Sequence, residues 1–178
     1  MSIEPQRDTR PLSVLFLCTQ NSARSQIAEA LMTRKIERVA PGRFTVASAG
    51  SAPAMRVNPM AVAALQAHGI DWKGRRPKPI DAVKDQRWDL IITVCDRARE
   101  TCPTMPGQPA FAHWGIDDPS EVPDERARER AFAETAAYLA RRIDLLLALP
   151  VETLERRALE MRVQQIADET PFPAKTLT

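Results

Sequence analysis

The chain has 178 residues, enough for one well-buried domain but few for two. Its 25 lysines and arginines and 23 aspartates and glutamates give a net charge of +2, and both signs are scattered along the chain, which argues against a nucleic-acid-binding protein. The first ten residues are polar, and the apolar stretch after them is too short for a signal peptide or a membrane span. We therefore expect a cytoplasmic protein with neither membrane nor nucleic acid among its partners.

The first half of the chain alternates between short apolar runs and helical patterns. Each strand prediction rests on a run of apolar, β-favouring residues, and the first such run ends at Cys18, as a buried parallel strand would. Each helix prediction rests on apolar residues at helical spacing, bounded by a cap such as Asn58 or by a stop such as Pro41-Gly42. The resulting elements are a strand at 12–18, a helix at 22–39, a strand at 44–47, a turn-rich loop at 48–53 and a helix at 59–67.

The second half continues the alternation, and its first strand also ends at a cysteine, Cys95. The patterns predict a strand at 90–94, a mobile segment with at most a short helix at 96–108, a strand at 110–112 and a helix at 124–147. Strands that alternate with helices are typical of parallel sheets. The sequence therefore predicts a single-domain α/β fold, a doubly wound four-stranded parallel sheet flanked by helices, with an extra C-terminal helix.

The extra helix lies in an amphipathic segment at 151–167. Its apolar face predicts either a packed additional helix or a contact for a second subunit, so a homodimer stays open. The tail at 170–178 contains two prolines and carries no regular pattern. We expect a catalytic domain at 11–149 and a C-terminal helical extension and tail at 150–178.

The loop after the first strand places Cys18 and Arg24 six positions apart, between a strand and the start of a helix. Such a loop can aim successive backbone N–H groups at a tetrahedral oxyanion, and the helix adds its partial positive end. The same field would lower the pKa of the Cys18 thiol, so we expect a thiolate, hydrogen-bonded by Ser25. Arg24 offers a planar fork for two oxyanion oxygens. The predicted oxyanion-binding residues are Thr19, Gln20, Asn21, Ser22, Ala23, Arg24 and Ser25.

The stretch from Val14 to Leu31, with Cys-Thr-Gln-Asn-Ser-Ala-Arg-Ser at its centre, resembles the start of the low-molecular-weight protein tyrosine phosphatase superfamily. Within that superfamily it is similar to the thioredoxin-coupled arsenate reductases. The resemblance continues through 48–50, 94–95 and 113–119 and covers roughly residues 12–148. Two departures are visible: the family loop often has glycine where Gln20 stands, and some reductases carry a second loop cysteine where this chain has Ala23.

The resemblance assigns the general acid to Asp118, the aspartate that precedes Pro119, with Asp117 as a weaker candidate. Expelling an oxygen from arsenate, or a phenol from a phosphate ester, requires a proton on the leaving group. The plainer interpretation of Asp-Asp-Pro is a turn, because aspartate and proline favour turns in any protein.

The resemblance also implies roles for Cys95 and Cys102 in arsenic detoxification. Cys18 would attack arsenate, Cys95 would then attack Cys18 with release of arsenite, and Cys102 would attack Cys95 to leave a Cys95–Cys102 disulfide. Thioredoxin would reduce that disulfide, with glutaredoxin and glutathione as the other reductant. Six residues separate Cys95 from Cys102, so the segment between them must bend or unwind to bring the α-carbons within about 7 Å.

Two other functions use the same residues. A low-molecular-weight tyrosine phosphatase needs only Cys18, Arg24 and Asp118, but such enzymes usually hold the aromatic ring between aromatic side chains. Here Ser120 follows Pro119, and the only tyrosine of the chain lies in a helical pattern. The phosphatase is therefore the alternative rather than the first choice. A thiol-based oxyanion sensor would share every cysteine but would not need Asp118.

The remaining polar motifs carry no further chemistry in this interpretation. Two distant histidines and no paired cysteines argue against a structural metal, and we expect no organic cofactor. His113 beside Trp114 is typical of a packing pair. Asn21, Glu29 and Ser48 lie where related reductases support the loop and bind potassium, and we interpret them as structural support.

Overall fold

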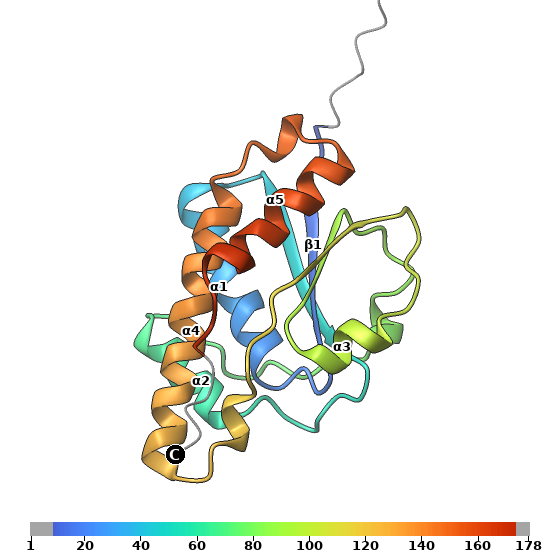
Figure 1. The fold of residues 1–178 in the computed structure, drawn as a ribbon. Helices are drawn as coiled ribbons and strands as arrows, with labels where there is room; N and C mark the ends of the chain where they lie inside the picture. The colour runs from blue at the N-terminus through green and yellow to red at the C-terminus, as the bar shows by residue number, and fades with distance from the viewer. Residues whose placement is uncertain (1–8, 174–178) are drawn as a thin grey trace, which may run out of the picture.

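Five α-helices and four strands make up residues 9–173, the part of the chain that the computed structural model describes (Figure 1). They confirm the predicted α/β fold with its extra C-terminal helix. Three short 3-10 helices join them: η1 (Ile80–Ala82), η2 (Pro119–Glu121) and η3 (Val151–Thr153). In chain order the main elements are β1 (Leu12–Cys18), α1 (Arg24–Val39), β2 (Phe44–Gly50), α2 (Pro59–Ala67), β3 (Leu90–Thr93), α3 (Asp96–Thr101), β4 (Ala110–His113), α4 (Glu125–Leu147) and α5 (Arg156–Glu169).

The four strands form one parallel sheet in the order β2-β1-β3-β4. The chain therefore adds β2 on one side of β1 and then returns to add β3 and β4 on the other side. In open α/β sheets, ligands bind outside the carboxyl ends of the strands at such a reversal. Here the reversal lies between β1 and β3, and these two strands lead directly to Cys18 and Cys95.

The centre of the sheet forms the core. Val14–Leu17 of β1 are at most 1% exposed, as expected for an apolar parallel strand that is covered on both faces. Helix α1 packs against α4, and α2 packs against both of them. In Figure 1, α1, α2 and α4 lie together on one side of the view and α3 on the other. Helix α3 contacts both β1 and β3, the two central strands.

Several boundaries differ from the sequence prediction by a few residues, and two of them adjoin the Cys18–Arg24 loop. Strand β2 continues to Gly50, although a turn-rich loop was predicted from Ser48 onward. The reason is tertiary: β1 offers a pairing partner to every residue of β2, down to the Cys18–Gly50 pair, and this pairing outweighs weak β propensity. Helix α1 begins at Arg24 rather than at Ser22, because Ser22 and Ala23 belong to the loop before it.

The C-terminal helix α5 packs on β4, the edge strand of the sheet. The carboxylate of Glu160 accepts a hydrogen bond from the backbone N–H of Phe111 at 2.8 Å. The Gln164 amide accepts from the N–H of His113 at 2.8 Å and donates to its carbonyl at 3.2 Å. Side chains of α5 thus satisfy backbone groups that an uncovered edge strand would leave unpaired. Of the two predicted alternatives, the packed additional helix is confirmed.

The chain after α5 has no helix or strand at 170–173, yet its first residues are packed. Arg142 of α4 is 2% exposed and donates through Nε to the Thr170 hydroxyl at 3.0 Å and through Nη2 to the Thr170 carbonyl at 2.7 Å. The ring of Phe172 lies edge-on to Tyr138, with 4.8 Å between ring centroids. The rest of the predicted tail, 174–178, lies outside the described residues.

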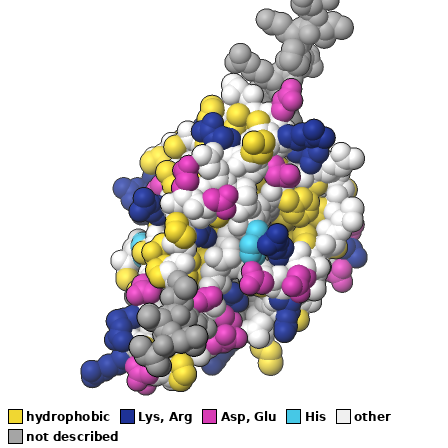
Figure 2. Space-filling model, in the orientation of Figure 1, with side chains coloured by type: hydrophobic (Ala, Val, Ile, Leu, Met, Phe, Trp, Pro, Cys, Tyr) yellow, Lys and Arg dark blue, Asp and Glu magenta, His cyan; other side chains and the backbone are white. Residues whose placement is uncertain are grey.

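The surface carries charges of both signs. On the face drawn in Figure 2, basic and acidic side chains are interspersed, with apolar groups scattered among them. No helix in residues 9–173 combines the length and the apolar character needed to cross a membrane.

Candidate active site

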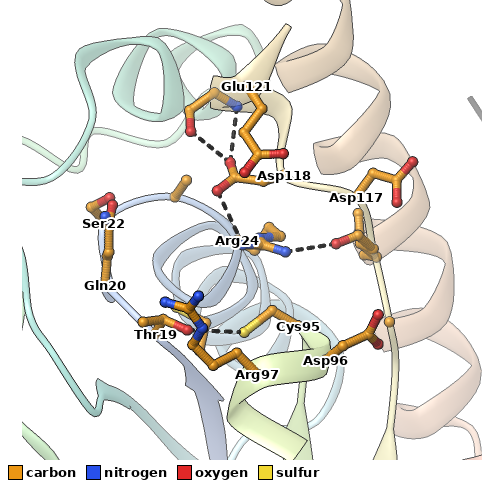
Figure 3. A pocket seen from close by; sticks show the side chains of 15 residues that line it. Thr19, Gln20, Ser22, Arg24, Cys95, Asp96, Arg97, Asp117, Asp118 and Glu121 are labelled. Atoms are coloured by element: carbon orange, nitrogen blue, oxygen red, sulfur yellow. Dashed lines mark hydrogen bonds and ion pairs between the residues drawn. The ribbon is translucent and has the colours of Figure 1, made fainter.

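A cavity of about 490 Å³ opens at the carboxyl ends of β1 and β3 (Figure 3). The loop after β1, the start of α3 and the segment between β4 and η2 form its walls. It therefore collects residues from three distant parts of the sequence. The lining residues are Cys18, Thr19, Gln20, Ser22, Ala23, Arg24, Cys95, Asp96, Arg97, Gly115, Ile116, Asp117, Asp118, Ser120 and Glu121.

The backbone carbonyls at the start of the Cys18–Arg24 loop face the segment after β2. The carbonyls of Cys18, Thr19 and Gln20 accept hydrogen bonds from backbone N–H groups of the segment after β2, at 3.4, 2.9 and 2.9 Å. A trans peptide unit points its N–H opposite to its C=O. The N–H groups of Thr19, Gln20 and Asn21 therefore point away from that segment, and the Asn21 N–H donates to the Cys18 sulfur at 3.1 Å. Successive N–H groups on one side of a loop are an arrangement that can bind an anion.

Asn21 gives the loop its curvature and holds it in place. Its φ of 49° lies in the left-handed region, which asparagine tolerates better than most residues. The Asn21 amide nitrogen donates to the hydroxyls of Ser25 and Ser48, both at 2.8 Å. Its side-chain oxygen accepts from the Gln26 amide at 3.0 Å and from the backbone N–H of Lys78 at 2.8 Å. The predicted supporting role of Asn21 matches these contacts.

A second layer lies behind Asn21. The Ser48 hydroxyl donates to the carboxylate of Glu29, and the ammonium group of Lys78 is 3.5 Å from the same carboxylate. The Trp72 indole N–H donates to the Gln26 side chain at 2.8 Å. Buried polar groups that are all satisfied in this way rigidify a loop. No group of three or more metal-binding side chains occurs in residues 9–173.

Gly50, at the end of β2, lies directly against the loop. A β-carbon at this position would be 2.5 Å from the Thr19 carbonyl oxygen and 2.9 Å from the Asn21 backbone nitrogen. Both distances are far below van der Waals contact, so any other residue would displace the loop. Glycine is needed here for close approach of two backbones rather than for its dihedral freedom.

The Cys18 sulfur is buried beneath the loop. It lies 2.7 Å from the Ser25 hydroxyl and accepts from the backbone N–H of Asn21 at 3.1 Å. Burial raises the pKa of the Cys18 thiol above its ordinary value, although Ser25, Arg24 and the Asn21 N–H each act to lower it. The predicted thiolate at neutral pH was therefore wrong for this arrangement, in which the loss of hydration outweighs the stabilising contacts.

Arg24 and Asp118 face each other across the cavity, as Figure 3 shows. The Arg24 guanidinium donates to the Ile116 carbonyl at 2.7 Å and to the Asp118 carboxylate at 3.2 Å. The other carboxylate oxygen of Asp118 accepts from the N–H and hydroxyl of Ser120. Asp117 is exposed at the cavity wall and makes no comparable contact within residues 9–173. Of the two neighbouring aspartates, Asp118 is the one that contacts Arg24.

Two of the three cysteines share the cavity. Cys95 precedes α3, and its sulfur lies 3.5 Å from the hydroxyl of Thr19 in the loop. Cys102 follows α3 and lines a different cavity, together with Arg99, Phe111 and Gln164. The two cysteines are seven positions apart in the chain. At the helical rise of about 1.5 Å per residue, their α-carbons lie roughly 10 Å apart, which is too far for a disulfide. The structure brings Cys95 to Cys18 and leaves Cys102 apart from both.

His113 connects the end of β3 to the start of α3. Its Nδ1 lies 2.8 Å from the Thr93 hydroxyl and its Nε2 2.9 Å from the Asp96 carboxylate. Trp114 is fully buried and its indole N–H donates to the Val163 carbonyl of α5. The predicted packing and hydrogen-bonding pair matches these contacts.

Sequence reasoning missed several residues around the site. Gln26 was overlooked inside the apolar face of a helix. A polar amide at such a buried position needs a hydrogen-bond partner, and this was the signal that could have revealed it. Lys78 lies between the helix predicted at 59–67 and the strand predicted at 90–94, in a stretch without a predicted element. Arg97 carried a visible signal, since it lies two positions after Cys95. The Ile116 carbonyl carried none, because a backbone acceptor leaves no mark in the sequence.

Known proteins resemble this chain in both sequence and structure. The sequence model of the family described as low molecular weight phosphotyrosine protein phosphatase matches residues 13–161. An arsenate reductase from Brevibacillus brevis is 40% identical over 132 residues, which cover 69% of this chain and 95% of that protein.

Two solved structures extend the likeness. The crystal structure of an arsenate reductase from Archaeoglobus fulgidus is 30% identical with a TM-score of 0.56, and the match covers 74% of this chain and 98% of that one. A thioredoxin-dependent arsenate reductase from Corynebacterium glutamicum is 28% identical with a TM-score of 0.54, over 74% of this chain and 60% of that one. The loop, the fold and these matches agree, and the chain belongs to the low molecular weight phosphotyrosine protein phosphatase family.

Proposed function

We propose that the protein is an arsenate reductase that converts arsenate to arsenite through Cys18, Cys95 and Cys102. The observation that carries the proposal is that Cys18 and Cys95 line one cavity together with Arg24 and Asp118. A phosphatase has no use for a second cysteine beside its nucleophile, whereas a reductase requires one. The arsenate reductases among the relatives support the same choice.

In the first step the loop binds arsenate and Cys18 attacks the arsenic atom. The N–H groups of the loop and the guanidinium of Arg24 hold the oxyanion oxygens. The Cys18 thiol loses its proton as the S–As bond forms, an As–O bond breaks, and Asp118, once it has taken up a proton, delivers it to the departing hydroxyl, which leaves as water. The proton released by the thiol balances the proton consumed in forming water. Arg24 and Asp118 are paired before arsenate binds, so the oxyanion takes the place of the carboxylate at Arg24 and frees Asp118 for its role as acid.

In the second step Cys95 attacks the sulfur of Cys18. An S–S bond forms, the S–As bond breaks, and its electron pair stays with arsenic, so As(V) leaves as As(III) in arsenite. The two thiols supply the two electrons. The hydroxyl of Thr19, the residue after Cys18, lies 3.5 Å from the Cys95 sulfur and holds it at the edge of the loop.

In the third step Cys102 attacks Cys95 and releases Cys18 as a thiolate. The resulting Cys95–Cys102 disulfide requires α3 to unwind, because the helix holds the two α-carbons too far apart. A dithiol protein then reduces this disulfide. Thioredoxin is the reductant we favour, on the likeness to the thioredoxin-dependent enzyme of Corynebacterium glutamicum, and glutaredoxin with glutathione is the other outcome of the test below.

We further propose residues 11–149 as the catalytic domain and 150–178 as an extension. The relay needs a compartment that keeps thiols reduced, and the cytoplasm is such a compartment.

The alternative function, a low-molecular-weight protein tyrosine phosphatase, is favoured by Cys18, Arg24 and Asp118, which suffice for a cysteinyl-phosphate. None of the described residues that line the cavity is aromatic, however, so the walls that would hold a phenol ring are missing.

Cysteine variants test the proposal. Cys18→Ser should abolish all activity, because it removes the nucleophile of both reactions. Cys95→Ser and Cys102→Ser should end multiple-turnover arsenate reduction yet keep hydrolysis of a small aryl phosphate within about threefold of the parent, because neither thiol takes part in phosphoryl transfer. The assay couples NADPH oxidation to arsenate through thioredoxin and its reductase, and in parallel through glutathione and glutaredoxin. Repeated arsenate turnover by both relay variants would refute the mechanism.

A further inference from the structure

A second arginine lines the cavity from a different wall. Arg97 belongs to α3, and in Figure 3 its side chain points from that helix toward the loop that carries Thr19. Arg24 and Arg97 are the only cationic residues among the described lining residues. They are outnumbered by the four carboxylates, Asp96, Asp117, Asp118 and Glu121.

The two arginines are not equally available to a ligand. Arg24 already donates hydrogen bonds to the Asp118 carboxylate, which offsets part of its positive charge, and to the Ile116 carbonyl. Arg97 is exposed and forms no ion pair within residues 9–173. Nearby Asp96 directs its carboxylate to His113 instead. Arg97 therefore contributes the free positive charge at the mouth of a cavity whose lining is otherwise acidic.

We propose that Arg97 is a second oxyanion-binding residue, which attracts dianions to the cavity and binds oxygens that Arg24 and the loop leave exposed. The inference deepens the function proposed above and rests on it for the identity of the substrate. A doubly charged tetrahedral anion that approaches four carboxylates needs a compensating charge. A guanidinium can also bind two oxygens of such an anion at once. Arsenate and phosphate fit this description, whereas singly charged anions gain less.

The position of Arg97 within α3 couples anion binding to the redox state. Cys95 and Cys102 lie immediately before and after this six-residue helix, and their disulfide requires the helix to unwind. Unwinding displaces Arg97 from the cavity wall. The oxidised protein should therefore bind oxyanions more weakly than the reduced protein, which limits rebinding of anions until the disulfide has been reduced.

The test measures the affinity for inorganic phosphate by titration calorimetry. It compares the reduced full-length parent protein with its Arg97→Gln and Arg99→Gln variants. Both changes remove one positive charge from α3, but Arg99 lines the other cavity, beside Cys102. Arg97→Gln should weaken phosphate binding about tenfold, the usual effect of losing a charge-assisted hydrogen bond, and Arg99→Gln less than twofold. Arg97→Lys should recover part of the loss. Equal affinities of the two glutamine variants would overturn the proposal.

Oxidised protein supplies a second measurement. In the parent, formation of the Cys95–Cys102 disulfide should weaken phosphate binding, and in Arg97→Gln the same oxidation should change the affinity much less. An equal loss in both proteins would contradict the coupling through Arg97. These readouts use phosphate binding alone, so failure of arsenate turnover would remove the proposed function and leave the role of Arg97 standing.

Discussion

The charge of Cys18 depends on where Arg24 points. In this structure Arg24 is turned to Asp118 and the Ile116 carbonyl, and burial dominates the pKa of the Cys18 thiol. The sequence predicted Cys18, Arg24 and Asp118, but not the Ile116 carbonyl, because only side chains leave a pattern in it. Their mutual arrangement was not predictable, since the partner of Arg24 lies 94 positions away along the chain.

The raised pKa of Cys18 can be measured by alkylation. Iodoacetamide reacts with thiolates, so the rate of Cys18 labelling should keep rising with pH beyond about 8.5, the ordinary thiol value. Asp118→Asn removes the carboxylate from Arg24, whose charge then acts more fully on Cys18, and this variant should shift the labelling profile to lower pH. Mass spectrometry of the labelled protein follows the reaction, with Asp117→Asn as the matched control. A parent profile that levels off below pH 7 would show that the thiolate is the resting form.

The general acid can be tested with aryl phosphates whose phenols differ in acidity. Asp118→Asn should lower kcat for phenyl phosphate about 10²- to 10⁴-fold, because a poor leaving group requires the proton. The loss should be smaller for 4-nitrophenyl phosphate, whose phenolate leaves more easily. Asp117→Asn should change kcat by less than about threefold. If both variants lost equal activity, or if the loss of Asp118→Asn did not depend on the leaving group, Asp118 would not be the acid.

At the scale of elements, the helices α5 and α3 show what the sequence patterns could and could not predict. The pattern at 151–167 predicted an amphipathic helix but left its partner open, because an apolar stripe looks the same against a sheet edge or a second subunit. The structure resolves this with side chains of α5 that bind the backbone of β4. The segment between Cys95 and Cys102, predicted to hold at most a short helix, forms the six-residue helix α3, and the unwinding of this helix stays a prediction.

Two neighbouring positions in α5 test its packing. Leu159 is 4% exposed and Met161 is 72% exposed, so truncation of the first removes buried contacts and truncation of the second does not. Leu159→Ala should lower the free energy of unfolding by about 2–5 kcal/mol, and Met161→Ala by less than about 0.5 kcal/mol. Urea titration gives both values. Similar midpoints for the two variants would mean that α5 contributes little to the folded monomer.

At the scale of the whole molecule, the order of the strands explains why the site lies where it does. Cys18 and Cys95 stand 77 positions apart in the sequence, yet they follow adjacent strands at the point where the sheet reverses its direction of growth. Alternating patterns predicted the parallel sheet and so, in outline, this meeting of strand ends. Close contacts such as that of Gly50 with the loop could not be predicted, because they depend on distances between backbones.

The central claim is the sequence of disulfides, and mass mapping after a single equivalent of arsenate tests it most directly. Reduced parent protein should yield a Cys95–Cys102 disulfide, and Cys102→Ser should stop one step earlier, with a Cys18–Cys95 disulfide and one arsenite per chain. Cys95→Ser should form neither. A Cys18–Cys102 disulfide in the parent, or arsenite released by Cys95→Ser at the parent yield, would contradict the proposed relay.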